Sequence, residues 1–143
     1  MKRMILENRP VLRMAGILFL ALLSACATVA PTEDEIIAER VQARWDALLA
    51  HDYATAYTYY SPAFRSQATA TDLEIMIRMR RVKWVGAKYR SHTCDGDLCT
   101  VVIDLSYQLA NPVPGVPSWG NVDRAKEQWI RVDGQWWFVP PKD

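Results

Sequence analysis

The chain has 143 residues, half of them hydrophobic, with 17 Lys and Arg against 16 Asp and Glu. This length suits one domain rather than two, and the balanced charge argues against a disordered protein or one that coats nucleic acid. Fourteen of the 15 aromatic residues follow Cys26. The remaining ~110 residues can therefore fill a hydrophobic core.

Residues 1–25 have the pattern of a targeting segment. Basic residues precede an uncharged stretch of nine residues, AGILFLALL, at 15–23. A membrane-spanning helix needs about 20 apolar residues, so this stretch is too short for a permanent span. We expect a cleaved signal peptide.

The stretch LSAC, at 23–26, resembles the lipobox of bacterial lipoproteins, in which a Leu and two small residues precede a Cys. The resemblance implies cleavage before Cys26, which then carries fatty chains, palmitate among them. Two or more chains anchor a protein stably to a membrane. Ala27, rather than Asp, implies an outer-membrane location facing the periplasm in a Gram-negative cell. The alternative is an ordinary secretory peptide with an unmodified Cys.

The mature chain is expected to begin with a short tether, 26–31, followed by the folded domain, 32–143. A capping box, Thr32-x-x-Glu35, predicts the start of a helix over 33–50. Its apolar stripe contains Ile37, Val41, Trp45 and Leu48 at helical spacing.

Three shorter helical segments are expected to follow. Asp52 caps a helix over 53–60, and Ser61 caps a turn at 62–65. A second box, Thr71-x-x-Glu74, predicts a helix over 72–81 with Leu73 and Ile77 turned inward.

The pattern then alternates over 85–94 and 99–109, which predicts two strands joined by the four-residue turn DGDL. Direct pairing of Cys94 with Cys99 would place Tyr89 opposite Asp104, so that the apolar faces of the strands disagree. A one-residue bulge near the hairpin tip restores agreement, and we expect one there.

The same two cysteines are expected to form a disulfide. Export places them in an oxidising compartment, and acylation of Cys26 leaves Cys94 and Cys99 as the only pair. Two thiols are too few for a metal site, and a redox motif usually has two residues between its cysteines rather than four. The sequence predicts no metal and no cofactor.

Residues 110–121 form a loop by composition, with three prolines and two glycines. A second hairpin follows in KEQWIRVDGQWWFVP, where Asp133-Gly134 marks the turn. Helices followed by four antiparallel strands predict an α+β fold in which a curved sheet wraps a long helix.

Three stretches resemble the nuclear transport factor 2-like family: the first helix running into LLAHDYATAYTYYSPAFR, then SQATATDLE, then EQWIRVDGQWWFVPP. The resemblance covers most of 33–141 and implies a cone-shaped domain, which in this family often pairs through the open sheet face, so it also implies a possible homodimer. It leaves function open, because the fold is found in enzymes, binding modules and assembly factors.

No convincing catalytic group is expected. Family enzymes such as ketosteroid isomerases work with Asp, His and Tyr inside the cone, where burial tunes their pKa. Here His51 lies at a helix end, His92 and Asp104 fall on the polar face of their strands, and Asp46 is expected in solvent.

Aromatic residues could line a pocket for a small apolar ligand, although filling the core is the commoner role. The candidates are Tyr57, Trp84, Tyr107, Trp129 and Trp137.

A basic segment and an isolated Trp are the candidate contacts. Arg78, Arg80, Arg81 and Lys83 could meet anionic lipid, although the solvent-exposed face of a helix end and a strand is the favoured explanation. Trp119, in the Pro-rich loop, could anchor a partner protein or fold over the cone mouth.

The sequence thus predicts a lipid-anchored envelope protein with a non-enzymatic accessory domain that binds an envelope protein or a small apolar ligand, and no nucleic acid. The alternatives are an isomerase or dehydratase and a structural envelope subunit. An open cavity of a few hundred Å³ holding a polar pair would favour the enzyme. A filled core with an exposed apolar patch would favour the partner role.

Overall fold

A computed structural model of the chain describes residues 30–109 and 120–141. Thr32–Asp143 form a compact unit separate from Met1–Pro31, and only this later unit is described below. Its helices come first: α2 (Glu33–Leu49), α3 (Tyr53–Tyr57), α4 (Pro62–Arg65) and α5 (Ala70–Arg78). The strands follow: β1 (Val82–Asp95), β2 (Leu98–Leu109), β3 (Gly120–Val132) and β4 (Gln135–Val139).

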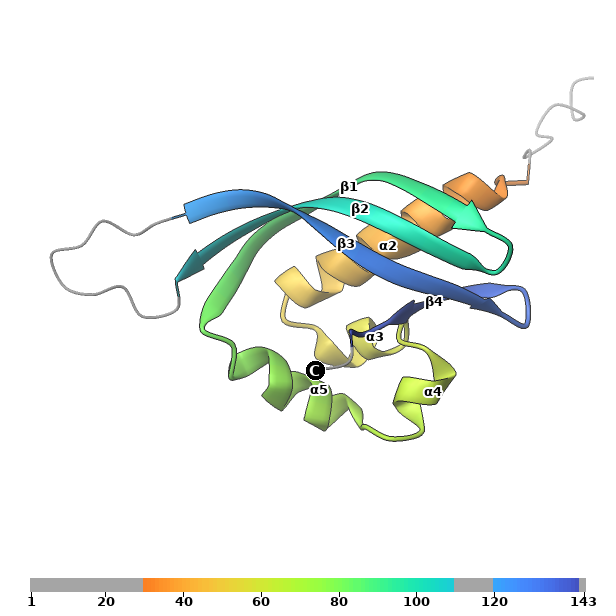
Figure 1. The fold of residues 1–143 in the computed structure, drawn as a ribbon. Coiled ribbons are helices and arrows are strands. Elements are labelled where there is room, and N and C mark those ends of the chain that lie inside the picture. Colours follow the sequence, from red (N-terminus) through yellow and green to blue (C-terminus); the bar gives the residue numbers. More distant parts are fainter. Residues whose placement is uncertain (1–29, 110–119, 142–143) are drawn as a thin grey trace, which may run out of the picture. The chain divides into compact units, whose positions relative to one another are not determined.

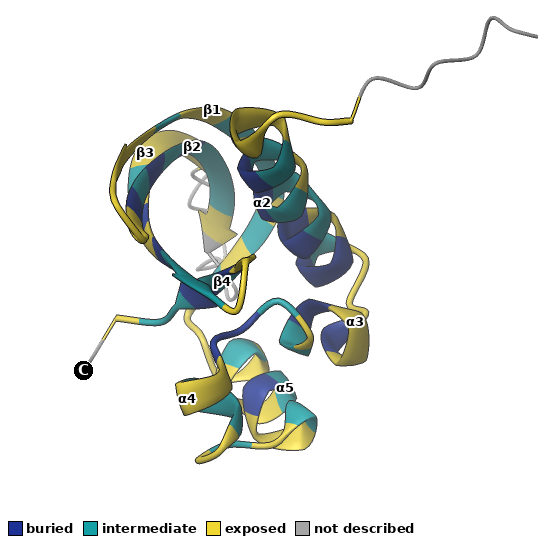
Figure 2. Cartoon of the chain, turned by 90° about the vertical axis from the view of Figure 1, so that its right-hand side faces the viewer, coloured by how far each residue is buried: buried dark blue, intermediate teal, exposed yellow. Residues whose placement is uncertain are grey.

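The four strands form one antiparallel sheet in the order β1-β2-β3-β4 (Figure 1). The sheet curves strongly beside α2, whose buried residues gather on the side turned toward the sheet and α3 (Figure 2). This arrangement confirms the predicted α+β class and the long helix packed on a curved sheet.

The start of α2 is capped as the sequence predicts. Thr32 N–H donates to Glu35 Oε2 across 2.8 Å, and Glu35 N–H donates back to Thr32 Oγ1 across 3.3 Å. The predicted box at Thr71 is wrong, because α5 begins two residues earlier with Thr69 as its cap and Asp72 as the reciprocal acid. An Asp at the third helical position completes the box in place of Glu.

The predicted bulge in the first hairpin is confirmed. Cys94 pairs with Cys99, and a register shift at Arg90 brings Tyr89 opposite the buried Ile103 instead of Asp104. A second shift, between Trp84 and Gly86, was not predicted. The hairpin turn is also shorter than expected, because Leu98 already pairs with Asp95. Gly96, at φ 58°, supplies the left-handed conformation that so tight a turn requires.

The bulge at Arg90 moves His92 to the other face of the sheet, so its predicted position on the polar face is wrong. His92 pairs with the buried Val101 and turns toward α2, with its side chain only 11% exposed. Asp104 behaves as expected: it lies on the outer face, where it pairs with Arg90 at 3.1 Å and Arg124 at 3.9 Å.

The second hairpin turns at Asp133-Gly134, as predicted, with φ of 53° and 74°. Its first strand begins at Gly120, so Gly120 and Asn121 belong to β3 rather than to the loop. The rest of that predicted loop, 110–119, lies outside the described residues.

The core lies between α2 and the concave side of the sheet. The predicted stripe of α2 is buried there, against Val101, Ile103, Trp129 and Phe138 of the strands. One member of the buried face of α2 is not apolar: Arg44 is only 2% exposed. Its position leads to the candidate site.

Candidate functional site

A cavity of about 280 Å³ opens between the C-terminal half of α2, helix α5 and the sheet. Its walls are largely apolar and include Leu73, Met76, Ile77, Trp84, Leu105 and Ala125. Met76 is partly exposed, so the cavity reaches the surface on its α5 side. Apolar walls around a few polar groups are typical of small-molecule sites.

Two buried charges, Arg44 on α2 and Glu127 on β3, also line this cavity. Arg44 Nη1 donates to Glu127 Oε1 across 2.9 Å. The indole N–H of Trp45 donates to the same oxygen across 3.0 Å, and that of Trp129 donates to Oε2 across 3.0 Å. Three N–H groups therefore hold the carboxylate in place and compensate for its burial.

The guanidinium of Arg44 is also held by contacts besides Glu127. Its Nη2 donates to Tyr60 Oη across 3.2 Å, and its carbon lies 3.5 Å from the ring centroid of Phe138. Its Nε has no hydrogen-bond partner among the described residues. Arg44 thus binds α2 to both the sheet and the segment after α3.

Hydrogen bonds occupy most of the polar atoms of this pair, which limits its use in acid–base catalysis. A general base must present a free lone pair to the proton that it removes. In Glu127, Oε1 already accepts two N–H groups and Oε2 accepts one, so a single lone pair remains on Oε2. The arrangement mainly supplies fixed polarity beside an apolar cavity and leaves one acceptor site for a proton.

Sequence reasoning missed both charged residues, although each interrupts an apolar pattern. Arg44 lies three residues after Val41 and four before Leu48, in the middle of the helix stripe. Glu127 alternates with Ala125 and Trp129 along the inward face of β3. A basic residue in one apolar face and an acidic residue in another indicate a buried ion pair where the two faces pack together.

Of the predicted pocket residues, Trp84 lines the cavity. Trp129 is fully buried in the core, and Tyr57 donates its hydroxyl to the carbonyls of Arg65 and Ala68. Trp137 stacks with Arg40 and Arg65, and Tyr107 lines a separate, shallow hollow. The structure therefore does not gather these five side chains around one space.

A second cavity, of about 360 Å³, lies beside the first. It contains three of the predicted contact residues, Arg78, Arg80 and Lys83, together with His51 and Tyr53. Arg78 pairs with Glu74 at 2.9 Å, and Arg80 lies 4.9 Å from the ring centroid of Trp84. Arg81 is exposed and does not line either cavity, and Trp119 lies outside the described residues.

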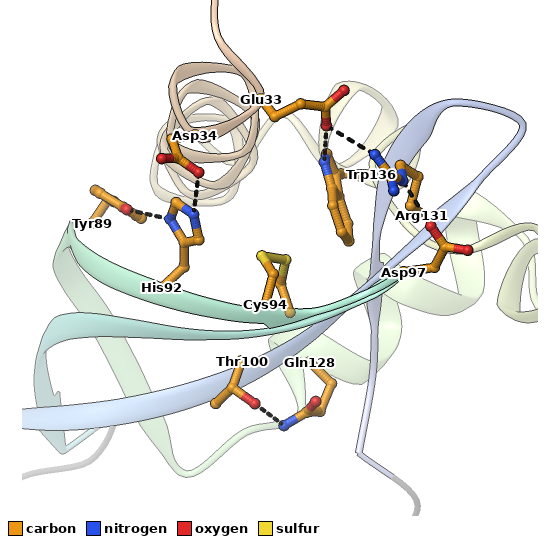
Figure 3. The surroundings of a disulfide bond; sticks show 11 residues. Glu33, Asp34, Tyr89, His92, Cys94, Asp97, Thr100, Gln128, Arg131 and Trp136 are labelled. Carbon is orange, nitrogen blue, oxygen red and sulfur yellow. Dashed lines mark hydrogen bonds and ion pairs between the residues drawn. A yellow bond between two sulfur atoms is a disulfide. The ribbon is translucent and has the colours of Figure 1, made fainter.

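The disulfide predicted between Cys94 and Cys99 is present at the tip of the first hairpin (Figure 3). The first turn of α2 contacts strands on either side of it. On one side, His92 bonds Tyr89 Oη at 2.6 Å and Asp34 at 3.1 Å. On the other side, Glu33 accepts from Arg131 and the Trp136 indole. Burial, and then the charge of Asp34, raises the pKa of Tyr89. These contacts hold the N-terminal end of α2 to the sheet.

Within the described ranges, no three His, Cys, Asp or Glu side chains are grouped as metal ligands. None of the helices in the described part of the chain has both the length and the apolarity to cross a membrane.

Comparison with known proteins gives likeness of fold only. No protein-family model and no curated protein matches the chain. Among solved structures, a SEC-C motif containing protein from Rhodopseudomonas palustris matches with a TM-score of 0.51 and 15% identity, over 71% of this chain and 73% of that one. One from Psychrobacter arcticus matches with a TM-score of 0.56 and 12% identity, over 78% of this chain and 63% of that one.

A third structure bears on the predicted resemblance. It is a candidate dehydratase of the nuclear transport factor 2-like family from Streptomyces avermitilis, with a TM-score of 0.50 and 16% identity, over 76% of this chain and 93% of that one. These identities are too low to carry an activity from one protein to another. The likeness to this structure, together with helices followed by a four-stranded antiparallel sheet, shows that the chain has a nuclear transport factor 2-like fold.

Proposed function

We propose that this protein is a lipid-anchored envelope protein whose domain binds a small apolar ligand in the cavity between α2, α5 and the sheet, without catalysing a reaction. The observation that carries the proposal is an open, apolar cavity whose only buried charges, within the described residues, are paired with each other. An apolar ligand can enter such a space without leaving either charge unpaired.

The lipid anchor rests on the LSAC stretch and on the apolar run before it. The cavity is lined by Arg44 and Trp45, eleven and twelve residues beyond the start of α2 at Glu33. At 1.5 Å per residue, this is roughly 17 Å along the helix from the tethered end. An anchored domain can thus keep its cavity accessible while its first turn stays near the membrane.

Binding can be tested with N-phenyl-1-naphthylamine, an uncharged apolar fluorophore. The full chain carrying Cys26→Ser, which lacks the acylation site, serves as the parent protein. We expect Ala125→Phe to fill the cavity and lower the affinity for the probe at least tenfold. Val122→Phe is the matched control, because Val122 is exposed on the same strand and does not line this cavity. Equal affinity in parent and Ala125→Phe chains, both folded by circular dichroism, would refute the proposal.

The second candidate function is an isomerase or dehydratase. One observation favours it: the cavity is open, of the expected size, and holds a buried polar pair. An enzyme of this class would exchange the α-protons of a bound ketone with solvent. We expect 2-decanone, incubated with the protein in deuterated water, to gain no more deuterium than with Glu127→Gln. Faster exchange with the unmodified residue would support the enzyme.

A further inference from the structure

The two cavities share one wall, which is formed by Ile77, Arg80 and Trp84. The Arg80 guanidinium lies 4.9 Å from the Trp84 ring centroid, and this ring meets Trp45 edge-on at 4.9 Å. Trp84 therefore has an apolar contact on the side of the first cavity and a cation beside it. A ligand that occupies both cavities would therefore contact this wall.

Cations outnumber carboxylates in the combined lining of the two cavities. Across the described residues, Arg44, Arg80 and Lys126 line the first cavity, and Arg78 and Lys83 add two cations in the second, which makes five. Among the described residues, Glu127 has the one carboxylate that lines either cavity, and it is already paired with Arg44.

This positive charge is local, because residues 26–143 carry 13 basic and 15 acidic side chains, for a net charge of −2. A positive recess on a slightly negative domain concentrates anions.

The second cavity also has hydrogen-bonding groups. His51 lies just beyond the end of α2 in a left-handed conformation, with φ of 59°, and its Nδ1 lies 2.9 Å from Tyr53 Oη. Within the described residues, Lys83 and Arg80 form no ion pair, whereas Arg78 is shared with Glu74. Lys83 and Arg80 can therefore meet an incoming anion without giving up an existing salt bridge.

We propose that the ligand is a single-chain amphipathic anion, with its apolar chain in the first cavity and its carboxylate or phosphate head among Lys83, Arg80 and His51 in the second. This deepens the proposed binding function and rests on it. Because the cations are exposed, the affinity falls as salt is added. The alkyl chain of the ligand supplies affinity through burial, and the anionic head determines the orientation of the ligand and the selectivity.

The test compares three kinds of probe on the full chain carrying Cys26→Ser, below micellar concentrations. Decanoate and a decyl lysophosphatidate have chain and head, 1-decanol has the chain alone, and acetate and inorganic phosphate have the head alone. We expect decanoate and the lysophosphatidate each to bind at least tenfold more tightly than 1-decanol. Acetate and phosphate should bind at least a hundredfold more weakly than decanoate and the lysophosphatidate. The ratio of decanoate to lysophosphatidate affinity identifies the preferred head.

The double substitution Arg78→Gln and Lys83→Gln alters only the second cavity. We expect it to lower decanoate affinity at least fivefold and to leave 1-decanol affinity unchanged. Lys88→Gln is the control, because Lys88 is an exposed strand cation outside both cavities.

The possible outcomes separate the two proposals. If 1-decanol binds and decanoate binds no better, the anionic head is refuted while the apolar site stands. If inorganic phosphate binds as tightly as decanoate, the second cavity is a site for free anions and the amphipathic ligand is refuted. If neither 1-decanol nor N-phenyl-1-naphthylamine binds, the proposed function itself fails.

Discussion

Arg44 Nη1 lies 2.9 Å from Glu127 Oε1, and the two side chains are only 3% and 6% exposed. The contact joins residues 83 positions apart and connects the long helix to the third strand. Burying two charges is costly unless they are paired and hydrogen-bonded. Here both conditions are met, so the pair fixes how α2 sits on the sheet at the edge of the cavity.

Breaking this pair from one side should strongly destabilise the fold. We expect Glu127→Leu to lower the free energy of unfolding by about 3–5 kcal/mol, because Arg44 and two indole N–H groups lose their acceptor. Arg44→Met should have a similar effect, because it leaves the Glu127 carboxylate without its cation. Urea unfolding followed by fluorescence measures both variants.

The double variant, Arg44→Met with Glu127→Leu, should lose much less than the sum of the single losses, because no buried charge remains. Strictly additive losses would mean that the two residues are not coupled.

The disulfide between Cys94 and Cys99 should stabilise the first hairpin modestly. It closes a loop over a sequence separation of five residues. The chain-entropy relation gives about 2 kcal/mol for so short a loop. We expect reduction with dithiothreitol to lower the melting temperature of the parent protein. The double variant Cys94→Ala, Cys99→Ala should melt at the same temperature with and without reductant. An unchanged melting temperature of the parent protein on reduction would contradict the assignment.

The cap of α5 should make the fold sensitive to acid. Hydrogen bonds from the side chain and then the backbone of Thr69 lower the pKa of Asp72 from its ordinary value of 3.8. A lowered folded-state pKa gives a contribution to stability that is complete above the unfolded value of about 3.8 and is lost as the pH falls through the folded value.

Thr69→Ala should therefore bring the pKa of Asp72 back toward its ordinary value and reduce the loss of stability on acidification. The measurement is a carbon-13 titration of the Asp72 carboxyl by nuclear magnetic resonance. Thr71→Ala is the control and should leave that pKa unchanged, because Thr71 makes no hydrogen bond to Asp72 in the box.

The anchor prediction concerns Cys26. Replacing it with Ser should move the protein from the membrane fraction to the soluble periplasmic fraction, because the acylation site is lost. Cell fractionation with metabolic labelling by palmitate measures this. The double variant Cys94→Ala, Cys99→Ala should remain in the membrane and keep its label. Retention of Cys26→Ser in the membrane would refute lipid anchoring.

Much of the fold was predictable because it depends on local signals. The apolar stripe of α2, the Asp133-Gly134 turn and the alternation of β2 each specify an element on their own. Even the bulge at Arg90 followed from two local constraints, the cysteine pairing and the need for apolar faces to agree. The position of His92 does not follow from simple alternation along the strand, because the bulge at Arg90 reverses the faces of the residues beyond it.

The candidate site was harder to predict because it depends on contacts between distant segments. Arg44 and Glu127 lie on different elements, and neither residue reveals its partner without the packing of α2 on β3. The aromatic residues pose the converse difficulty. Their residue types suit a pocket, but Trp129 is packed in the core and Tyr57 donates its hydroxyl to backbone carbonyls. Of the five candidates, Trp84 lines the cavity beside Arg44 and Glu127, and Tyr107 lines a separate hollow.

The most direct test of the central claim, that the cavity beside Arg44 and Glu127 binds a small apolar ligand, is a nuclear magnetic resonance titration with 2-decanone. The Cys26→Ser chain is used, with amide and indole resonances assigned. The account predicts saturable shifts at Ile77, Ala125 and the Trp84 indole, which Ala125→Phe abolishes. Shifts confined to the outer hollow at Tyr107 and Val122, or no saturable shift at all, would contradict it.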